Sequence, residues 1–280
     1  MSRVKEFFGI YIKRDDVDWK SIVTAQRCPY TGKKCFKVRK SNPDISIGVC
    51  TVHYSSHNNV MICPHRLLER RQIFMDCVHL LSLHEPGNEL HLLSEVSVPG
   101  GSVDYFLVSV RKNKVIDFAG IELQTLDTTG SLWSERAALM QSKAIEVNEA
   151  DLSSKTFSMN WKMSAKTILI QMHHKIETFE HLGKHLALVV QDCFYDYMVR
   201  EFSFSHFEQA RQGDSVHVHS YSLDETDNNS LRLILKNRTS TNAEGIALCL
   251  GLQAETKIEL ERIIRYLEAR VSENTLLKIV

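Results

Sequence analysis

A pair of apolar runs near the middle of the chain constrains the fold more than any other stretch. The runs cover residues 103–110 and 115–123 and flank a short polar segment, 111–114. Runs of this length, rich in β-branched and aromatic residues and separated by a turn-like segment, predict a β-hairpin. If the hairpin is symmetric about Asn113, Asp104 lies directly opposite Glu122, with Cβ atoms about 4.5–5.5 Å apart.

The two facing carboxylates repel each other unless a proton or a cation lies between them. A hard divalent cation fits, because Mg²⁺ is commonly held by one or two carboxylates and water. Gln124 follows Glu122 by two positions and therefore projects from the same strand face, whereas parity directs Asp117 and Asp127 to the other side. The alternative is that these are ordinary polar residues on an exposed hairpin face. The nearly apolar run 116–126 favours a strand covered on both faces, where charged groups need partners.

Composition narrows the class of protein. The 280 residues include 43% hydrophobic ones, enough for a core in one or two domains, and the formal net charge is zero. Any basic surface therefore has to be local. No apolar run approaches the roughly 18 residues of a membrane span, and the N-terminal residues lack the pattern of a signal peptide. We expect a cytosolic protein whose seven cysteines are thiols or metal ligands rather than disulfides.

Four of the cysteines fall within a short, polar and irregular stretch, with the spacing C-x6-C-x14-C-x12-C. They are Cys28, Cys35, Cys50 and Cys63. Four thiolates around a tetrahedral metal would supply the folding free energy that this stretch lacks in apolar residues. The spacing does not match the common zinc fingers, and the alternative is a set of small buried thiols. Cys77, Cys193 and Cys249 stand alone in apolar surroundings and are predicted core residues.

The same stretch is locally basic. Its cationic residues are Lys33, Lys34, Lys37, Arg39 and Lys40, followed by Arg66, Arg70 and Arg71. Such a run is usually a solvated face, but on a rigid metal-held module it is also a plausible surface for phosphate contacts.

Periodicity gives an approximate order of elements along the rest of the chain. It predicts helices over residues 67–83, 134–145, 160–183 and 258–271, and strands near 92–98, at 185–191 and at 246–252. Residues 194–202 fit a helix or a strand. Glu95 precedes a Pro-Gly-Gly turn and either reaches the cation or is a rim carboxylate. We divide the chain into an N-terminal segment with the cysteine module, 1–83, and a second domain, 84–280.

A hairpin that carries Asp104 and then Glu122-x-Gln124, followed by a helix and a strand, resembles the PD-(D/E)XK nuclease core. That core is an α/β (α+β) fold in which a mixed sheet is flanked by helices. Taken together, the motifs resemble the NotI family of type II restriction endonucleases, over nearly the whole chain. They are Glu6-Phe7-Phe8-Gly9, Cys28-Pro29, Cys35, Gly48-Val49-Cys50, Cys63-Pro64-His65-Arg66, Glu95-Val96-Ser97-Val98, Asp104 and Ile121-Glu122-Leu123-Gln124-Thr125-Leu126-Asp127.

This resemblance implies Mg²⁺-dependent hydrolysis of phosphodiester bonds in double-stranded DNA. Mg²⁺ would be held by Asp104, Glu122 and the backbone carbonyl of Leu123, with Glu95 reaching it directly or through water. Gln124 takes the position usually held by lysine and, being uncharged, would orient water or a phosphate oxygen. The four cysteines would hold a structural metal, iron or zinc, since both accept tetrahedral thiolate sulfur. The resemblance also implies a bacterial cytoplasmic protein, a homodimer, and a cognate DNA methyltransferase in the same host.

The chain is shorter than the family pattern between Cys63 and Glu95 and between Glu95 and Asp104. This departure bears most on Glu95, and it prevents the recognition sequence from being carried over. Two other functions stay open at this point. One is a PD-(D/E)XK nuclease of low sequence specificity in defence or repair, and the other is a metal-stabilised DNA-binding protein that does not cut.

Overall fold

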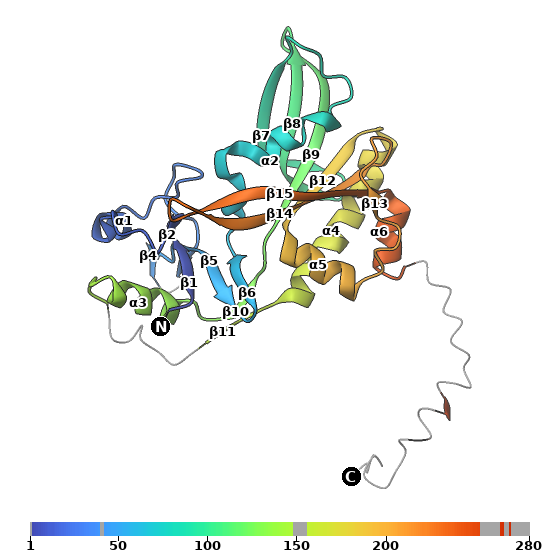
Figure 1. Ribbon diagram of the computed structural model, residues 1–280. Coiled ribbons are helices and arrows are strands. Elements are labelled where there is room, and N and C mark those ends of the chain that lie inside the picture. Colours follow the sequence, from blue (N-terminus) through green and yellow to red (C-terminus); the bar gives the residue numbers. More distant parts are fainter. Residues whose placement is uncertain (1, 40–41, 148–155, 253–263, 266–268, 270–280) are drawn as a thin grey trace.

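The largest element of the fold is a seven-stranded mixed sheet. The computed structural model describes residues 2–39, 42–147, 156–252, 264–265 and 269 (Figure 1). The sheet has the strand order β13-β15-β14-β12-β9-β8-β7. Its strands are β7 (Glu89–Val98), β8 (Gly101–Arg111), β9 (Lys114–Gln124), β12 (His185–Gln191), β13 (Glu208–Gln209), β14 (Val216–Thr226) and β15 (Ser230–Thr241). Only β12 pairs in parallel, with β9 and with β14, so the expected mixed sheet is confirmed.

The predicted hairpin is β8–β9, and its register comes from a bulge. Lys112 and Asn113 form a two-residue turn with φ values of 51° and 59°, the left-handed conformation that tight hairpin turns require. The turn pairs Arg111 with Lys114, so the hairpin is not symmetric about Asn113. The register then shifts by one residue next to Ser109, which pairs with Asp117. From there to Tyr105 opposite Ile121 the register is the predicted one.

Two helices lie on the path from β9 to β12, and the second of them, α4, packs on the main sheet. The chain passes through β10 (Thr128–Gly130), α3 (Trp133–Ser142), β11 (Phe157–Met159) and α4 (Trp161–His181) before it enters β12. The helices predicted at 134–145 and 160–183 and the strand at 185–191 are therefore confirmed. All residues of β12 are buried, as expected for a central parallel strand. After β12 the undecided segment 194–202 forms α5 (Asp192–Glu201).

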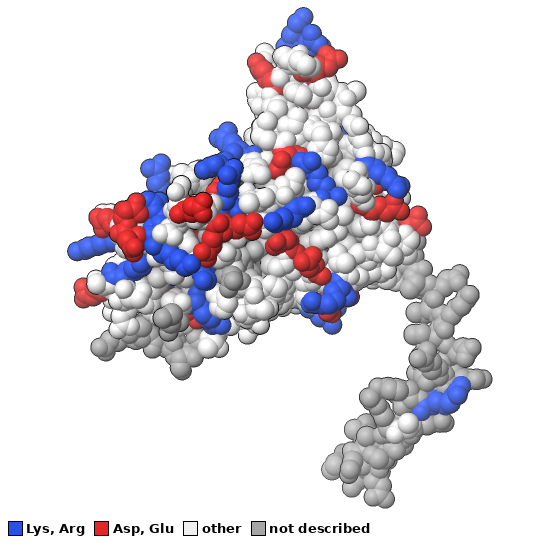
Figure 2. Space-filling model, in the orientation of Figure 1, with Lys and Arg blue, Asp and Glu red and all other residues white. Residues whose placement is uncertain are grey.

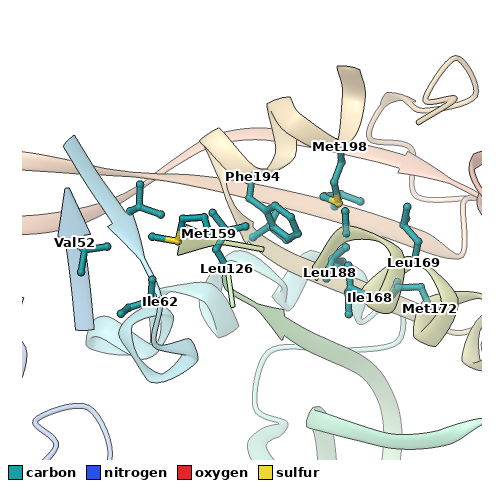
Figure 3. Close-up of a cluster of buried hydrophobic side chains, with 14 of the residues drawn as sticks. Val52, Ile62, Leu126, Met159, Ile168, Leu169, Met172, Leu188, Phe194 and Met198 are labelled. Atoms are coloured by element: carbon teal, nitrogen blue, oxygen red, sulfur yellow. The ribbon is translucent and has the colours of Figure 1, made fainter. Parts of the chain in front are cut away.

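The two faces of the sheet contact different apolar clusters, because alternate residues of a strand point to opposite sides. From β12, Leu188 lies in a cluster with Ile168 of α4 and Phe194 of α5 (Figure 3). Val189 lies instead in a cluster with Phe74 of the segment that follows the cysteines. Both faces are thus covered, as the apolar run of β9 predicted.

A second, smaller sheet has the order β2-β1-β5-β6 and comes from the N-terminal segment. The N-terminal elements are β1 (Val4–Phe7), β2 (Ile10–Tyr11), α1 (Trp19–Ala25), β3 (Val38–Arg39), β4 (Asn42–Ser46), β5 (Val49–Tyr54) and β6 (His57–Met61). Val52 and Ile62 from this segment share a buried cluster with Leu126, Met159 and Phe194, so residues on both sides of position 83 form one continuous core (Figure 3).

A buried arginine reinforces this connection. Arg66 is 1% exposed. Its Nε donates to Glu6 Oε2 at 2.7 Å, its Nη1 to Glu69 Oε2 at 3.0 Å and its Nη2 to the Leu231 carbonyl at 2.9 Å. The guanidinium therefore joins β1 to β15 and is not part of the surface for phosphate contacts that the sequence suggested.

Two expectations about local structure were wrong. The helix expected at 67–83 is broken into three short elements, η1 (Pro64–Arg71), α2 (Gln72–Asp76) and η2 (Val78–Leu80). The first break occurs because Arg70 and Arg71 adopt the left-handed backbone conformation, with positive φ. The strand expected at 246–252 is the helix α6 (Ala243–Cys249), whose N-cap Asn242 accepts the Gly245 N–H at 3.0 Å. The pair β14–β15 was not predicted, because β14 buries histidines and serines rather than a run of apolar residues. The helix expected at 258–271 lies largely outside the described residues.

No helix among the described residues is long and apolar enough to cross a membrane.

The buried histidines of β14 make stability dependent on pH. His217 is 1% and His219 0% exposed, and both lie beside the ring of His79. Burial lowers the pKa of His217 from 6.5 to about 4, and neighbouring histidines contribute. Burial also lowers the pKa of His219 from 6.5 to about 3, and the charge of Arg238 contributes.

We predict that the free energy of unfolding is largest above pH 6.5 and falls as the pH drops toward 4. Below pH 6.5 the unfolded chain binds protons that the folded chain does not, so each histidine contributes a slope of at most about 1.4 kcal/mol per pH unit. Urea unfolding between pH 4 and 8 measures this slope. The variant His219→Asn, which cannot be protonated, should show a shallower acid limb, and an unchanged limb would contradict the assignment.

Candidate active site

Three acidic residues lie in one row across the strands β7, β8 and β9. In the β7–β8 pair, Ser94 faces Tyr105 and Val96 faces Val103, so Glu95 lies opposite Asp104. In the β8–β9 pair, Tyr105 faces Ile121, and Asp104 and Glu122 are the next pair in the same register. Glu95 has a φ of 55°, which interrupts the regular edge strand at this position. The structure therefore places the three acids that the sequence singled out in one row, although among the described residues no three such side chains converge into a group that could hold a metal ion.

The carboxyl groups of Asp104 and Glu122 are in contact. Asp104 lies close enough to Glu122 to interact with its carboxyl group, and the backbone N–H of Leu123 donates to Asp104 Oδ2 at 2.8 Å. Glu122 is 3% exposed. Burial raises its pKa to about 7; the nearby charge of Asp104 raises it further, and Lys175 opposes both. The two carboxyl groups therefore lie beside each other on adjacent strands.

Lys175 of α4 is a member of the site that sequence analysis missed. Its Nζ lies 2.5 Å from Glu122 Oε1, and the residue is 4% exposed. Helical spacing could have found it: Lys175 follows Met172 by three positions and precedes Phe179 by four, so it lies on the apolar stripe of the helix. A lysine on such a stripe needs a buried anionic partner.

Gln124 lies two residues beyond Glu122 at the end of β9 and is half-buried. Its Nε2 donates to the neighbouring Thr125 carbonyl at 2.6 Å. Asp117, which strand parity placed elsewhere, is indeed separate: it pairs with Lys184 at 2.5 Å and accepts the Leu83 N–H at 2.8 Å.

A cleft of about 540 Å³ is lined by two acids of the row, Asp104 and Glu95. Asp104 and Glu95 lie on one side, together with Tyr105 and Leu123, and the cysteine-bearing segment forms the opposite wall. That wall includes Tyr30, Thr31, Lys33, Lys34, Phe36, His65 and Arg71. Two segments that are distant in sequence thus face each other across one opening, with acids on one side and lysines on the other.

The basic residues of the cysteine segment divide into two groups. Lys37 donates to the Ile62 carbonyl, and Arg66 is buried in its ion pairs, so both are structural. Lys33, Lys34 and Arg71 line the cleft. Across β14 and β15, by contrast, charges of both signs are interspersed (Figure 2), as in the pairs Lys13–Glu225 at 2.9 Å and Lys236–Asp224 at 3.4 Å.

The four cysteines are buried close to one another. Their exposed fractions are 6% for Cys28, 9% for Cys35, 6% for Cys50 and 4% for Cys63. Cys50 and Cys63 share a hydrogen bond, which raises the pKa of Cys50 and lowers that of Cys63. Cys28 bonds to His65, and Cys35 is near enough to feel the charges of Cys28 and Cys63.

Backbone N–H groups point at each of these sulfur atoms. The donors include Thr31 for Cys28, Lys37 for Cys35, Gly9 for Cys50 and His65 for Cys63. Even so, no three His, Cys, Asp or Glu side chains in the described part of the chain converge in a geometry that could hold a metal ion. Cys77 and Cys249 are buried core residues as predicted, and Cys193 is partly exposed.

Comparison with known proteins identifies the family. The model of the family described as "Restriction endonuclease NotI" matches residues 23–214, which span the cysteine segment, the row of acids, α4 and β12. No curated protein and no solved structure matches the chain. Because the family match covers more than half of the 280 residues, this chain belongs to the NotI restriction endonuclease family, whose members are site-specific endonucleases acting on double-stranded DNA.

Proposed function

We propose that this protein is a type II restriction endonuclease that hydrolyses phosphodiester bonds of double-stranded DNA with Mg²⁺ bound at Asp104 and Glu122. The observation that carries the proposal is the contact between these carboxyls, with Asp104 lining a cleft that has lysines on its far wall. The mixed sheet, with the acids on adjacent strands and helix α4 behind them, supports a PD-(D/E)XK core.

The donor set fits a hard divalent cation. Two carboxylates in contact need a shared positive charge, and Asp104, Glu122 and the Leu123 carbonyl would supply oxygen ligands of the kind that Mg²⁺ takes. Bound there, the ion would activate a water nucleophile and polarise the scissile phosphate. The Leu123 N–H fixes Asp104 at 2.8 Å. Glu95, opposite Asp104 in the same cleft, would hold a water of the metal, and Gln124 would orient the nucleophile or a phosphate oxygen.

The four-cysteine cluster would hold a structural iron or zinc ion. The support is that all four thiols are buried close together and that backbone N–H groups point at their sulfur atoms. Such N–H donors favour the thiolate form that binds a metal ion. Such an ion would fix the segment that carries Lys33 and Lys34 across the cleft from Asp104, where these lysines would contact DNA phosphates.

The protein would act as a homodimer, because palindromic DNA sites match two-fold protein symmetry. A cognate methyltransferase would protect the host DNA.

Cleavage of long genomic duplex DNA with Mg²⁺ distinguishes the proposal from its alternatives. Discrete bands support a site-specific enzyme, a smear indicates a nuclease of low specificity, and intact but retarded DNA indicates a protein that binds without cutting.

We predict that Glu122→Gln lowers the cleavage rate by a factor on the order of 10²–10³ or more while DNA binding in Ca²⁺ persists, because one of the two anionic ligands is lost. Asp117→Asn is a matched control, since Asp117 is also buried on β9 and also pairs with a lysine at 2.5 Å. It should lose roughly 1–3 kcal/mol of stability but cut at the wild-type rate. Normal cutting by Glu122→Gln would refute the proposed site.

We predict about one iron or zinc ion per chain in elemental analysis. Cys63→Ser should lose this metal and melt at a lower temperature, because the metal contributes folding free energy. Cys249→Ser is the control, since this thiol is buried outside the cluster and bonds to the Ser203 carbonyl at 3.0 Å. Metal-free wild-type protein, or a variant Cys63→Ser that keeps the metal, would reject the structural ion.

A further inference from the structure

The ion pair between Lys175 and Glu122 is buried. The side chains are 6% and 4% exposed, and Nζ lies 2.5 Å from Oε1. All residues of α4 are described, and its buried set is Ser164, Ala165, Ile168, Leu169, Met172, Lys175, Ile176 and Phe179. Lys175 is the one charged member of that set. A leucine or methionine there would continue the apolar stripe without the desolvation cost of a buried ammonium group.

The neighbouring turn is shaped to bring the helix close to this point. A Cβ atom on Gly100 would lie 1.9 Å from the His174 carbonyl oxygen, and one on Gly101 would lie 3.2 Å from Lys175 Cε. Thr178 Oγ1 also donates to the Pro99 carbonyl at 3.3 Å. The turn 99–101 leads directly into β8 and Asp104, so two glycines without side chains set the distance between the lysine and the strand that carries the first acid.

The negative charges of the site explain why a positively charged side chain is needed beside it. When Glu122 is ionised, it and Asp104 bring two negative charges together, and Gln124, on the same strand face, brings none. A scissile phosphate would add further negative charge. Lys175 is the positive group that contacts this pair directly, whereas Lys33 and Lys34 lie on the far wall of the cleft.

We propose that Lys175 is a positioning residue that supplies, from helix α4, the fixed positive charge that Gln124 does not provide. It holds Glu122 Oε1 and leaves the other carboxylate oxygen directed at Asp104 and the metal between them. It also partly neutralises the carboxylate pair, so that an anionic phosphate can approach. This inference rests on the proposed nuclease function and adds a residue to that site.

The test compares Lys175→Met with Lys184→Met. Lys184 is a matched control because it pairs with Asp117 of the same strand at the same distance, 2.5 Å, away from the row of acids. Single-turnover cleavage of a DNA fragment cut by the wild type is followed at pH 8 as Mg²⁺ is varied. Thermal melting of each variant reports folding.

We expect Lys175→Met to lower the maximal rate by a factor on the order of 10²–10³ and to reduce the Mg²⁺ concentration needed for half-maximal rate. The two effects run in opposite directions because the variant site carries one more net negative charge, which attracts Mg²⁺ but repels phosphate. Damage to folding alone would worsen both quantities. Lys175→Arg, and Gln124→Lys added to Lys175→Met, should each recover at least about tenfold in rate by restoring a cation.

Other outcomes would contradict either the role of Lys175 or the nuclease function. A maximal rate for Lys175→Met within about threefold of wild type, an equal loss in Lys184→Met, or a raised Mg²⁺ requirement would overturn the role of Lys175. Failure of the wild-type protein to cut DNA would instead refute the nuclease function itself, so the two failures are distinguishable.

Discussion

The active-site arrangement depends on one extra residue in a hairpin. The turn at Lys112 and Asn113 sets a register in which Asp104 would face Ile121, and the bulge beside Ser109 shifts this register by one. Since neighbouring strand residues point to opposite faces, the unshifted hairpin would direct Asp104 and Glu122 to different sides of the sheet. The bulge therefore decides whether the two carboxyls lie on the same face of the sheet. Every chemical feature of the site follows from that placement.

A contact between two buried carboxylates is costly, and the surrounding structure offsets that cost. The Leu123 N–H and the Lys175 ammonium group each take up part of the negative charge. Burial still raises the pKa of Glu122 to about 7, so the site without a metal ion is poorly satisfied. The divalent cation that we propose would relieve a repulsion that folding has already imposed.

The N-terminal segment contributes to the site through its rigid attachment to the main sheet. Arg66 joins β1 to β15, and Val52 and Ile62 share a buried cluster with α5. These contacts fix the cysteine segment as the second wall of the cleft, opposite Asp104 and Glu95. The short cysteine-rich stretch and the acidic strands therefore form a single concave surface in a chain whose formal net charge is zero.

The sequence by itself determined the hairpin, the central strand 185–191, the long helix α4, the three acids of the row and the family. These features depend on local periodicity and on motifs that are continuous in the chain. Only the tertiary structure decided the bulge, the role of Arg66, the helix α6 and the pair β14–β15. That pair could not be predicted from apolar patterns, because β14 buries histidines and serines. It alone brought Lys175 to Glu122, 53 positions apart, because packing between a helix and a sheet selects partners that chain spacing does not encode.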